Sequence, residues 1–308
     1  MAKHNIHLAE GDILKNQYEI IQQIGSGGMS VVYLAKECKE ENRLWAIKVA
    51  DMEKKISKRL FSEAKILSEL DHPSLPKIAD FFSSPDKEFF YLVQEYVEGE
   101  TLYEWFEQND CFIDEETVVN ICIQLCDVLH YLHSRKPSPI IYRDLKPANI
   151  MITKTRDIKL IDFGIARKYT ENKAKDTLQI GTVGFAAPEQ FEKRQSDTRT
   201  DLFSLGALMY YLLSGGKYVY ITQKPIQFFR KQLPKSLKKC IHLLVKSNPN
   251  ERIQTAGEVK DYLKKTQMQL AKGKNHSLKK GLLISKYVFS IFFFIGVIVY
   301  IAYDQFHK

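Results

Sequence analysis

Apolar and polar positions follow two different periods along the chain. In the first hundred residues, apolar side chains alternate with polar ones or form short runs rich in β-branched and aromatic residues, which predicts strands at 18–24, 31–37, 44–50 and 88–96. Apolar residues at helical spacing over 57–70 predict one helix between the third and fourth strands. The pattern therefore indicates a strand-rich lobe with a single interrupting helix.

The period changes to three or four after residue 100. Apolar residues recur at this spacing over 117–134, 201–216 and 255–265, which predicts helices there. A strand-rich lobe followed by a helical lobe about twice its size predicts an α+β fold with two lobes.

The end of the chain has a third pattern. Residues 287–303 contain no charged side chain and are rich in Phe, Ile and Val. As a helix this segment would be about 25 Å long, slightly less than a ~30 Å hydrocarbon core, and 282–284 could extend it if Lys286 reaches the headgroups. The pattern predicts a C-terminal transmembrane helix; a buried core helix is the alternative.

Charge is concentrated before this segment. The net charge is +8, but Lys264 to Lys286 contains seven lysines and no acid. Without these lysines and without Asp304 and Lys308 at the end of the chain, residues 1–263 hold 37 basic and 36 acidic side chains. A nearly neutral body does not indicate nucleic-acid binding. The lysines predict a cytoplasmic body by the positive-inside rule, and they either contact anionic lipid or form a merely solvated linker.

The first candidate chemistry lies in the strand-rich lobe. Glycines cluster between two predicted strands at 25–32, where a backbone hairpin could approach phosphates or simply form a flexible turn. Lys48 lies within an apolar strand and needs an anionic partner if it is buried, for which Glu63 on the next helix is suitable. An ordinary surface salt bridge would also explain this pair.

The most informative motifs follow in the helical lobe. The sequence contains Arg-Asp-Leu-Lys-Pro-Ala-Asn at 143–149, Asp-Phe-Gly at 162–164 and Ala-Pro-Glu at 187–189. Together with the glycine-rich segment, Lys48 and Glu63, these motifs occur in the order and spacing of protein kinases over residues 18 to about 263. The chain resembles eukaryotic-like (Hanks-type) bacterial serine/threonine protein kinases.

This resemblance implies the bilobal protein-kinase fold, the cofactors ATP and Mg²⁺ (with Mn²⁺ as an alternative) and protein substrates with Ser or Thr acceptors. Lys48, oriented by Glu63, should hold the α- and β-phosphates, and Asp144 should accept the proton of the substrate hydroxyl. Lys146 should neutralise the γ-phosphate. Asn149 and Asp162 should bind the metal ion. Further nucleotide contacts are expected at Ile24, Gly25, Ser26, Gly27, Gly28, Met29, Ser30, Val32, Ala46, Glu95, Val97 and Met151.

At several positions the chain carries a residue that differs from the one usual in the family, and at others it carries a residue whose family role is structural. Gln94 takes the gatekeeper position, where bacterial relatives commonly carry Met. Ser30 replaces the third glycine of the loop, and Tyr142 replaces a His that packs in the family's internal hydrophobic stack. The resemblance also implies structural roles for three residues: an ion pair between Glu189 and Arg252, and an Asp201 that holds the catalytic loop.

The resemblance also suggests regulation. Because an arginine, Arg143, precedes Asp144, a phosphate in the 165–186 segment is expected to pair with it and order the loop. Thr177 is the first candidate for autophosphorylation and Thr170 the second, whereas Thr182 should lie beside the substrate site.

These observations divide the chain into segments. We expect an N-terminal extension at 1–17, a kinase domain at 18–265 with lobes at 18–97 and 98–265, a basic linker at 266–286, the membrane helix at 287–303 and a tail at 304–308. The predicted protein is a single-pass cell-membrane serine/threonine protein kinase with a cytoplasmic kinase domain. Five cysteines without C-x-x-C spacing suit a reducing compartment.

Two other functions remain alternatives: a nucleotide-binding pseudokinase or scaffold, and a small-molecule kinase of related fold such as an aminoglycoside phosphotransferase. The presence of all four of Lys48, Asp144, Asn149 and Asp162 argues against the first. Glu189 and Arg252 argue against the second.

Overall fold

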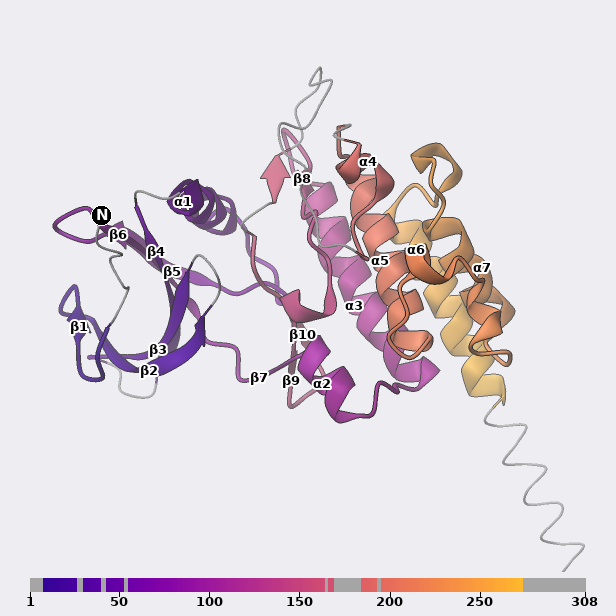
Figure 1. The fold of residues 1–308 in the computed structure, drawn as a ribbon, viewed down its shortest axis with the longest axis horizontal. Coiled ribbons are helices and arrows are strands. Elements are labelled where there is room, and N and C mark those ends of the chain that lie inside the picture. Colours follow the sequence, from indigo (N-terminus) through magenta and orange to yellow (C-terminus); the bar gives the residue numbers. More distant parts are fainter. Residues whose placement is uncertain are drawn as a thin grey trace, which may run out of the picture.

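The computed structural model describes residues 8–26, 30–39, 43–52, 55–163, 166–168, 184–192 and 195–273. These residues form two lobes, with strands β1–β6 on the left of Figure 1 and helices α3–α7 on the right. The predicted α+β, bilobal architecture is therefore confirmed.

The first lobe is built on one antiparallel sheet of six strands in the order β1-β2-β3-β4-β6-β5. Helix α1 lies between β4 and β5 in the sequence. The elements are β1 (Ile13–Leu14), β2 (Tyr18–Ser26), β3 (Val31–Glu37), β4 (Leu44–Asp51), α1 (Lys55–Leu67), β5 (Ile78–Ser83) and β6 (Phe89–Glu95).

The alternation of side chains along these strands gives the sheet two apolar faces. One face buries a cluster that includes Tyr33, Trp45 and Val93. On the other face, Leu60 and Ala64 of α1 pack against Leu92 and its neighbours. Helix α1 is thereby fixed against the centre of the sheet, which positions the residues on its remaining faces.

The second lobe is mainly helical and contains two small sheets, β10-β9-β7 and β11-β8. Its elements are β7 (Gly99–Thr101), α2 (Leu102–Gln108), α3 (Glu115–His133), β8 (Ile140–Ile141), η1 (Pro147–Asn149), β9 (Ile150–Thr153), β10 (Ile158–Leu160), β11 (Arg167–Lys168), α4 (Pro188–Phe191), α5 (Thr198–Leu213), α6 (Val219–Thr222), η2 (Ile226–Phe228), α7 (Lys235–Leu244), η3 (Pro249–Glu251) and a last helix at 256–273.

Helix α5 is the centre of this lobe. Every residue from Thr200 to Leu213 is buried, as expected for a helix that is apolar on almost all sides. Helix α3 packs on one side of α5 and α7 on another. Asp114 caps α3 by accepting a hydrogen bond from the backbone N–H of Thr117, and Asp197 caps α5 through the N–H of Arg199.

The last described helix passes the boundary that the sequence suggested at 265. It continues to 273, with Leu263 and Thr266 fully buried, so residues 266–273 of the predicted linker are helical. The predicted spanning segment at 287–303 lies outside the described residues. Within them, no helix has the length and apolar character needed to cross a membrane.

Candidate active site

A cavity of about 500 Å³ lies between the two lobes. Both lobes contribute to it: the ends of β2, β3 and β4 line it together with the segment that connects β6 to β7 and residues around η1 and β10. The predicted nucleotide-contact residues that line it are Ile24, Gly25, Ser26, Ser30, Val32, Ala46, Lys48, Glu95, Val97 and Met151. Gly27, Gly28 and Met29 lie outside the described residues.

Lys48 is held at the back of this cavity by two carboxylates. Its Nζ lies 3.0 Å from Oε2 of Glu63 and 3.1 Å from Oδ1 of Asp162. Burial by itself would lower the pKa of Lys48, but the charges of Glu63 and Asp162 outweigh burial and raise this pKa above its ordinary value. The ammonium therefore stays charged and points into the cavity from the sheet.

Glu63 connects α1 of the first lobe to the Asp-Phe-Gly segment of the second. Its side chain is 1% exposed, and Oε1 also accepts a hydrogen bond of 3.0 Å from the backbone N–H of Phe163. Burial raises the pKa of Glu63, while Lys48 and this N–H act in the opposite direction. The sequence predicted the pair with Lys48; the bond to Phe163 could only be seen in the structure.

Asp144, Lys146 and Asn149 form a second group, which reaches the cavity through Asn149. Lys146 Nζ lies 2.8 Å from Oδ2 of Asp144, and Nδ2 of Asn149 donates to the same oxygen at 2.9 Å and to the Asp144 carbonyl at 3.0 Å. Asn149 and Asp162 both line the cavity. All the predicted catalytic and metal-binding side chains are therefore gathered at one site.

The loop that carries Asp144 is fixed by a buried carboxylate. Asp201, which is fully buried at the start of α5, accepts hydrogen bonds from the backbone N–H groups of Tyr142 (2.9 Å) and Arg143 (2.7 Å), and its Oδ2 lies 2.8 Å from Nε2 of His133. Arg143 has a φ of 68° and Asp162 a φ of 64°, conformations that non-glycine residues rarely adopt. Strained backbone of this kind is typical of functional sites held in place by their surroundings.

Tyr142 occupies the position where the family usually has His. Its ring is fully buried at 5.0 Å from that of Phe163, in an edge-to-face arrangement, and its hydroxyl donates to the carbonyl oxygen of Ile161. The tyrosine therefore links the catalytic loop to the Asp-Phe-Gly segment through both a ring contact and a hydrogen bond.

Glu189 and Arg252 form the expected buried pair away from the cavity. Nη1 and Nη2 of Arg252 lie 2.8 and 2.7 Å from the two oxygens of Glu189. The neighbouring Gln190 donates to the carbonyl oxygen of Arg143 at 3.0 Å. The Ala-Pro-Glu segment is thus connected both to the end of the domain and to the catalytic loop.

Some features of the cleft have no counterpart in the sequence analysis. Lys159 Nζ lies 2.9 Å from both carboxylate oxygens of Glu95 and so fixes this side chain at the connection between the lobes. Among the described residues, the only buried side-chain oxygen or nitrogen without a hydrogen-bond partner is Oε1 of Gln94, which also lines the cavity. Lys159 and Glu95 are 64 residues apart, and no local signal connects them.

The donor set of the cleft suits a divalent cation. Asp162 supplies a carboxylate that is 46% exposed and lies beside Lys48, and Asn149 supplies an amide that lies beside Asp144; both Asp162 and Asn149 line the cavity. Mg²⁺ prefers oxygen ligands and completes its shell with phosphate and water. In the described part of the chain, no three His, Cys, Asp or Glu side chains form a metal cluster, so a cation here would rely on phosphate oxygens as well.

Comparison with known proteins agrees with this geometry. The family model of the protein kinase domain matches residues 18–272. A probable serine/threonine-protein kinase of Clostridium perfringens is 33% identical over 81% of the chain and 38% of its own length. Serine/threonine-protein kinase PknB of Mycolicibacterium smegmatis is 32% identical over 80% of the chain and 42% of its own length. Serine/threonine-protein kinase PrkC of Bacillus subtilis is 30% identical over 82% of the chain and 41% of its own length.

The chain therefore belongs to the protein kinase family. The alignments span about two fifths of the length of these relatives.

Proposed function

We propose that this protein is an ATP-dependent serine/threonine protein kinase. The observation that carries the proposal is that Lys48, Asn149 and Asp162 line one interlobe cavity, with Asp144 hydrogen-bonded to Asn149 beside it. An in-line phosphoryl transfer requires mainly positioned groups and neutralised charge, and this cavity offers both cations and carboxylates at hydrogen-bond distance from one another.

In the proposed reaction, Lys48 binds the α- and β-phosphates of ATP, and Glu63 keeps its ammonium in place. Asp144 accepts the proton of a Ser or Thr hydroxyl as the oxygen of that hydroxyl bonds to the γ-phosphorus and the bond to ADP breaks. Lys146 stabilises the charge on the transferred group. Asn149 and Asp162 hold Mg²⁺, which offsets the charge of the phosphate oxygens.

Phosphoryl transfer from labelled ATP by the full chain tests this proposal, with Asp144→Asn as the inactive variant and Asp261→Asn, an exposed residue of the last helix, as the matched control. We expect Mg²⁺-dependent label on protein Ser or Thr for the wild type and the control only. Nucleotide binding without transfer would indicate a pseudokinase, and transfer to aminoglycosides instead of proteins would indicate a small-molecule kinase.

Autophosphorylation is a further part of the proposal. Arg143, which precedes Asp144, is buried, and its backbone is held by Asp201 and Gln190. A phosphate on Thr177, or secondarily on Thr170, would pair with this arginine and order the segment that carries it. Both threonines, and Thr182, lie outside the described residues. Active protein that carries no phosphate on this segment in mass spectrometry would refute this part.

We also propose that the chain is tethered to the cytoplasmic face of the cell membrane by residues 287–303. The support is the absence of charge in this segment and the lysine-rich sequence before it. Because the last described helix continues to 273, the test compares the full chain with a chain truncated after Gly273. Only the full chain should remain in the membrane fraction after carbonate extraction; equal extraction of both would refute the tether.

A further inference from the structure

A second cavity of about 620 Å³ lies in the helical lobe, away from the interlobe cleft. It lies between α7 and the α6–η2 segment, and it shares no lining residue with the cleft. Its walls combine apolar groups with the stems of basic side chains. The apolar lining residues are Tyr210, Val219, Pro225, Ile226, Ile241 and Val245.

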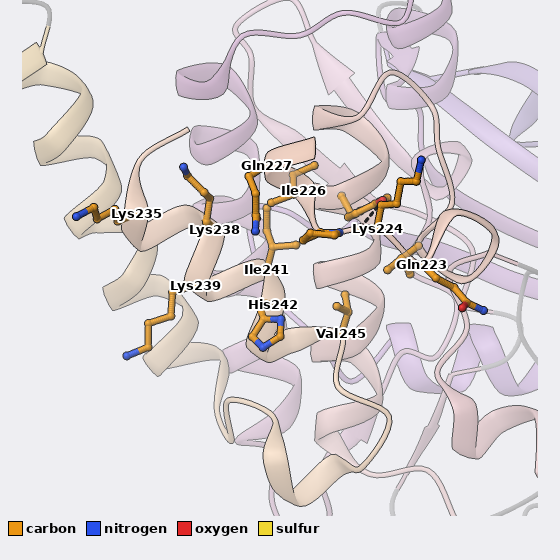
Figure 2. Close-up of a pocket in the computed structure, with 13 residues that line it drawn as sticks. Gln223, Lys224, Ile226, Gln227, Lys235, Lys238, Lys239, Ile241, His242 and Val245 are labelled. Atoms are coloured by element: carbon orange, nitrogen blue, oxygen red, sulfur yellow. Dashed lines mark hydrogen bonds between the residues drawn. The ribbon is translucent and has the colours of Figure 1, made fainter. Parts of the chain in front are cut away.

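The polar lining of this cavity carries positive charge from lysines, beside the neutral Gln223 and Gln227. Four lysines and His242 line it, and no Asp or Glu does. In Figure 2, Lys224 projects on one side of the pocket, and Lys235, Lys238 and Lys239 project on the other. We refer to these four lysines as the lysine rim.

None of the rim lysines pairs with a carboxylate in the part of the chain that the structure describes. Lys238 donates to the carbonyl oxygen of Lys231 at 3.0 Å, and Lys224 lies 4.0 Å from the ring centroid of Phe228. Each ammonium has three donors, so both retain capacity for an anionic ligand. An uncompensated cluster of like charges beside a cavity favours an anion as its occupant.

The start of α7 adds to this positive potential. Helix α7 follows Pro234 without a side-chain cap, and its first turn contains no acidic residue. Three of the four rim lysines, Lys235, Lys238 and Lys239, lie instead near this end, where the helix dipole is itself positive. Positive side chains near the positive end of a helix dipole destabilise the helix, and a bound negative group would offset this repulsion.

The start of α7, which carries three of the rim lysines, contacts the last helix near the end of its described part. Ser236 of α7 contacts the last helix, with its Oγ 2.7 Å from Oγ1 of Thr266 and 2.9 Å from Oε1 of Gln269. After residue 273, only thirteen residues precede the apolar segment at 287–303. Even fully extended, thirteen residues reach about 45 Å, so a tethered domain would stay within that distance of the bilayer.

Large apolar side chains are exposed on the same elements. Ile221, just before the pocket-lining residues 223–227, is 77% exposed, and Phe228, just after them, is 58% exposed. Met268, beside Gln269 on the last helix, is 64% exposed. Basic residues combined with exposed apolar ones are typical of surfaces that rest on a membrane interface.

We propose that the cavity and its lysine rim bind the headgroup of an anionic phospholipid and so dock the kinase domain on the membrane surface. This inference rests on the proposed membrane tether, because the short distance in sequence from the last helix to the proposed membrane segment at 287–303 is what favours a lipid over an acidic protein segment as the ligand. The apolar floor would accommodate the glycerol and upper acyl region, and the rim lysines would bind the phosphate.

Lysine footprinting of the full chain in lipid nanodiscs tests the proposal. The chain is reconstituted in discs of phosphatidylcholine alone or with phosphatidylglycerol, acetylated briefly, and analysed by mass spectrometry. Acetylation of the rim lysines should slow about fivefold or more in the anionic discs only. Lys39 and Lys87, exposed in the first lobe, serve as internal references and should be unchanged.

Two matched variants extend the test. Lys238→Glu/Lys239→Glu should abolish the protection of Lys224 and Lys235, whereas Lys39→Glu/Lys87→Glu, with the same change of charge, should retain it. Both variants should keep wild-type phosphoryl transfer in detergent, since neither pair lines the cleft.

Three outcomes would overturn the inference. Equal acetylation in both kinds of disc would exclude headgroup binding while leaving the tether intact. Equal protection by inorganic phosphate or by an acidic peptide in phosphatidylcholine discs would assign the cavity to a soluble anion. Failure of the chain to co-purify with either disc would refute the tether, and the headgroup binding with it, without bearing on the kinase activity.

Discussion

The buried pair of Glu189 and Arg252 allows a quantitative prediction about stability. The two side chains are 5% and 0% exposed, and the guanidinium also donates to the carbonyl oxygens of Lys246, Ser247 and Arg199. Arg252→Met would leave a buried carboxylate without its cation, which costs about 3–5 kcal/mol in the free energy of unfolding. At about 2–4 °C per kcal/mol for a domain of this size, the melting temperature should fall by about 6–20 °C.

Thermal unfolding followed by circular dichroism measures this change. The double variant Glu189→Gln/Arg252→Met should recover part of the loss, because the glutamine is neutral and can still accept the hydrogen bond from Thr200. Lys154→Met, which removes the exposed partner of Glu98, is the control and should leave the transition unchanged. A fall of less than about 2 °C for Arg252→Met, or no recovery in the double variant, would refute the reasoning.

Three further predictions follow from single residues. Lys48→Ala should retain the fold but reduce turnover about a hundredfold or more, since positioned charge supplies most of this catalysis; a near wild-type rate would contradict the role of Lys48. Gly206→Ala should destabilise the domain by about 1–3 kcal/mol in urea unfolding, because the new Cβ would lie 2.5 Å from Cβ of Leu244; an unchanged midpoint would show that α7 can move aside. Exposed Cys38 should react with iodoacetamide at pH 8 in the native protein. Burial raises the pKa of the Cys122, Cys126 and Cys240 thiols, which should react only after unfolding; labelling of these three at the rate of Cys38 in the native protein would contradict their burial.

Long, strongly patterned elements could be predicted from the sequence. The strands that begin at Tyr18, Val31 and Leu44 start at the predicted residues, and helices α3 and α5 begin and end within a few residues of their predicted bounds. These segments bury one or both faces, so hydrophobic periodicity determines them. The strand at 78–83 was not predicted, because its sequence Ile-Ala-Asp-Phe-Phe-Ser does not alternate cleanly and its pairing with β6 is tertiary.

The sequence could predict that the candidate site residues lie together, but not the contacts that hold them. The motifs around Asp144 and Asp162 are local in sequence, and their joint spacing carries the information. The contact of His133 with Asp201 joins residues 68 positions apart, and the bond from Phe163 to Glu63 joins residues 100 apart. Such contacts depend on the packing of α3, α5 and α1, which no local pattern specifies.

The extent of the last helix could not be predicted from local sequence either. The run of lysines after Lys264 indicates a linker by composition, but Thr266 is buried against α7, where it contacts Ser236. This tertiary contact extends the last helix to 273 despite its basic sequence. Composition alone therefore did not indicate that the helix continues past 265.

Calorimetry of nucleotide binding tests most directly whether the cleft gathers one ammonium, two carboxylates and an amide around a metal-bound triphosphate. The full chain should bind one ATP, and binding should weaken about tenfold or more when Mg²⁺ is chelated or when Asp162 is changed to Asn. Asp261→Asn should bind like the wild type. No uptake of nucleotide, or an affinity that is the same with and without Mg²⁺, would contradict the account.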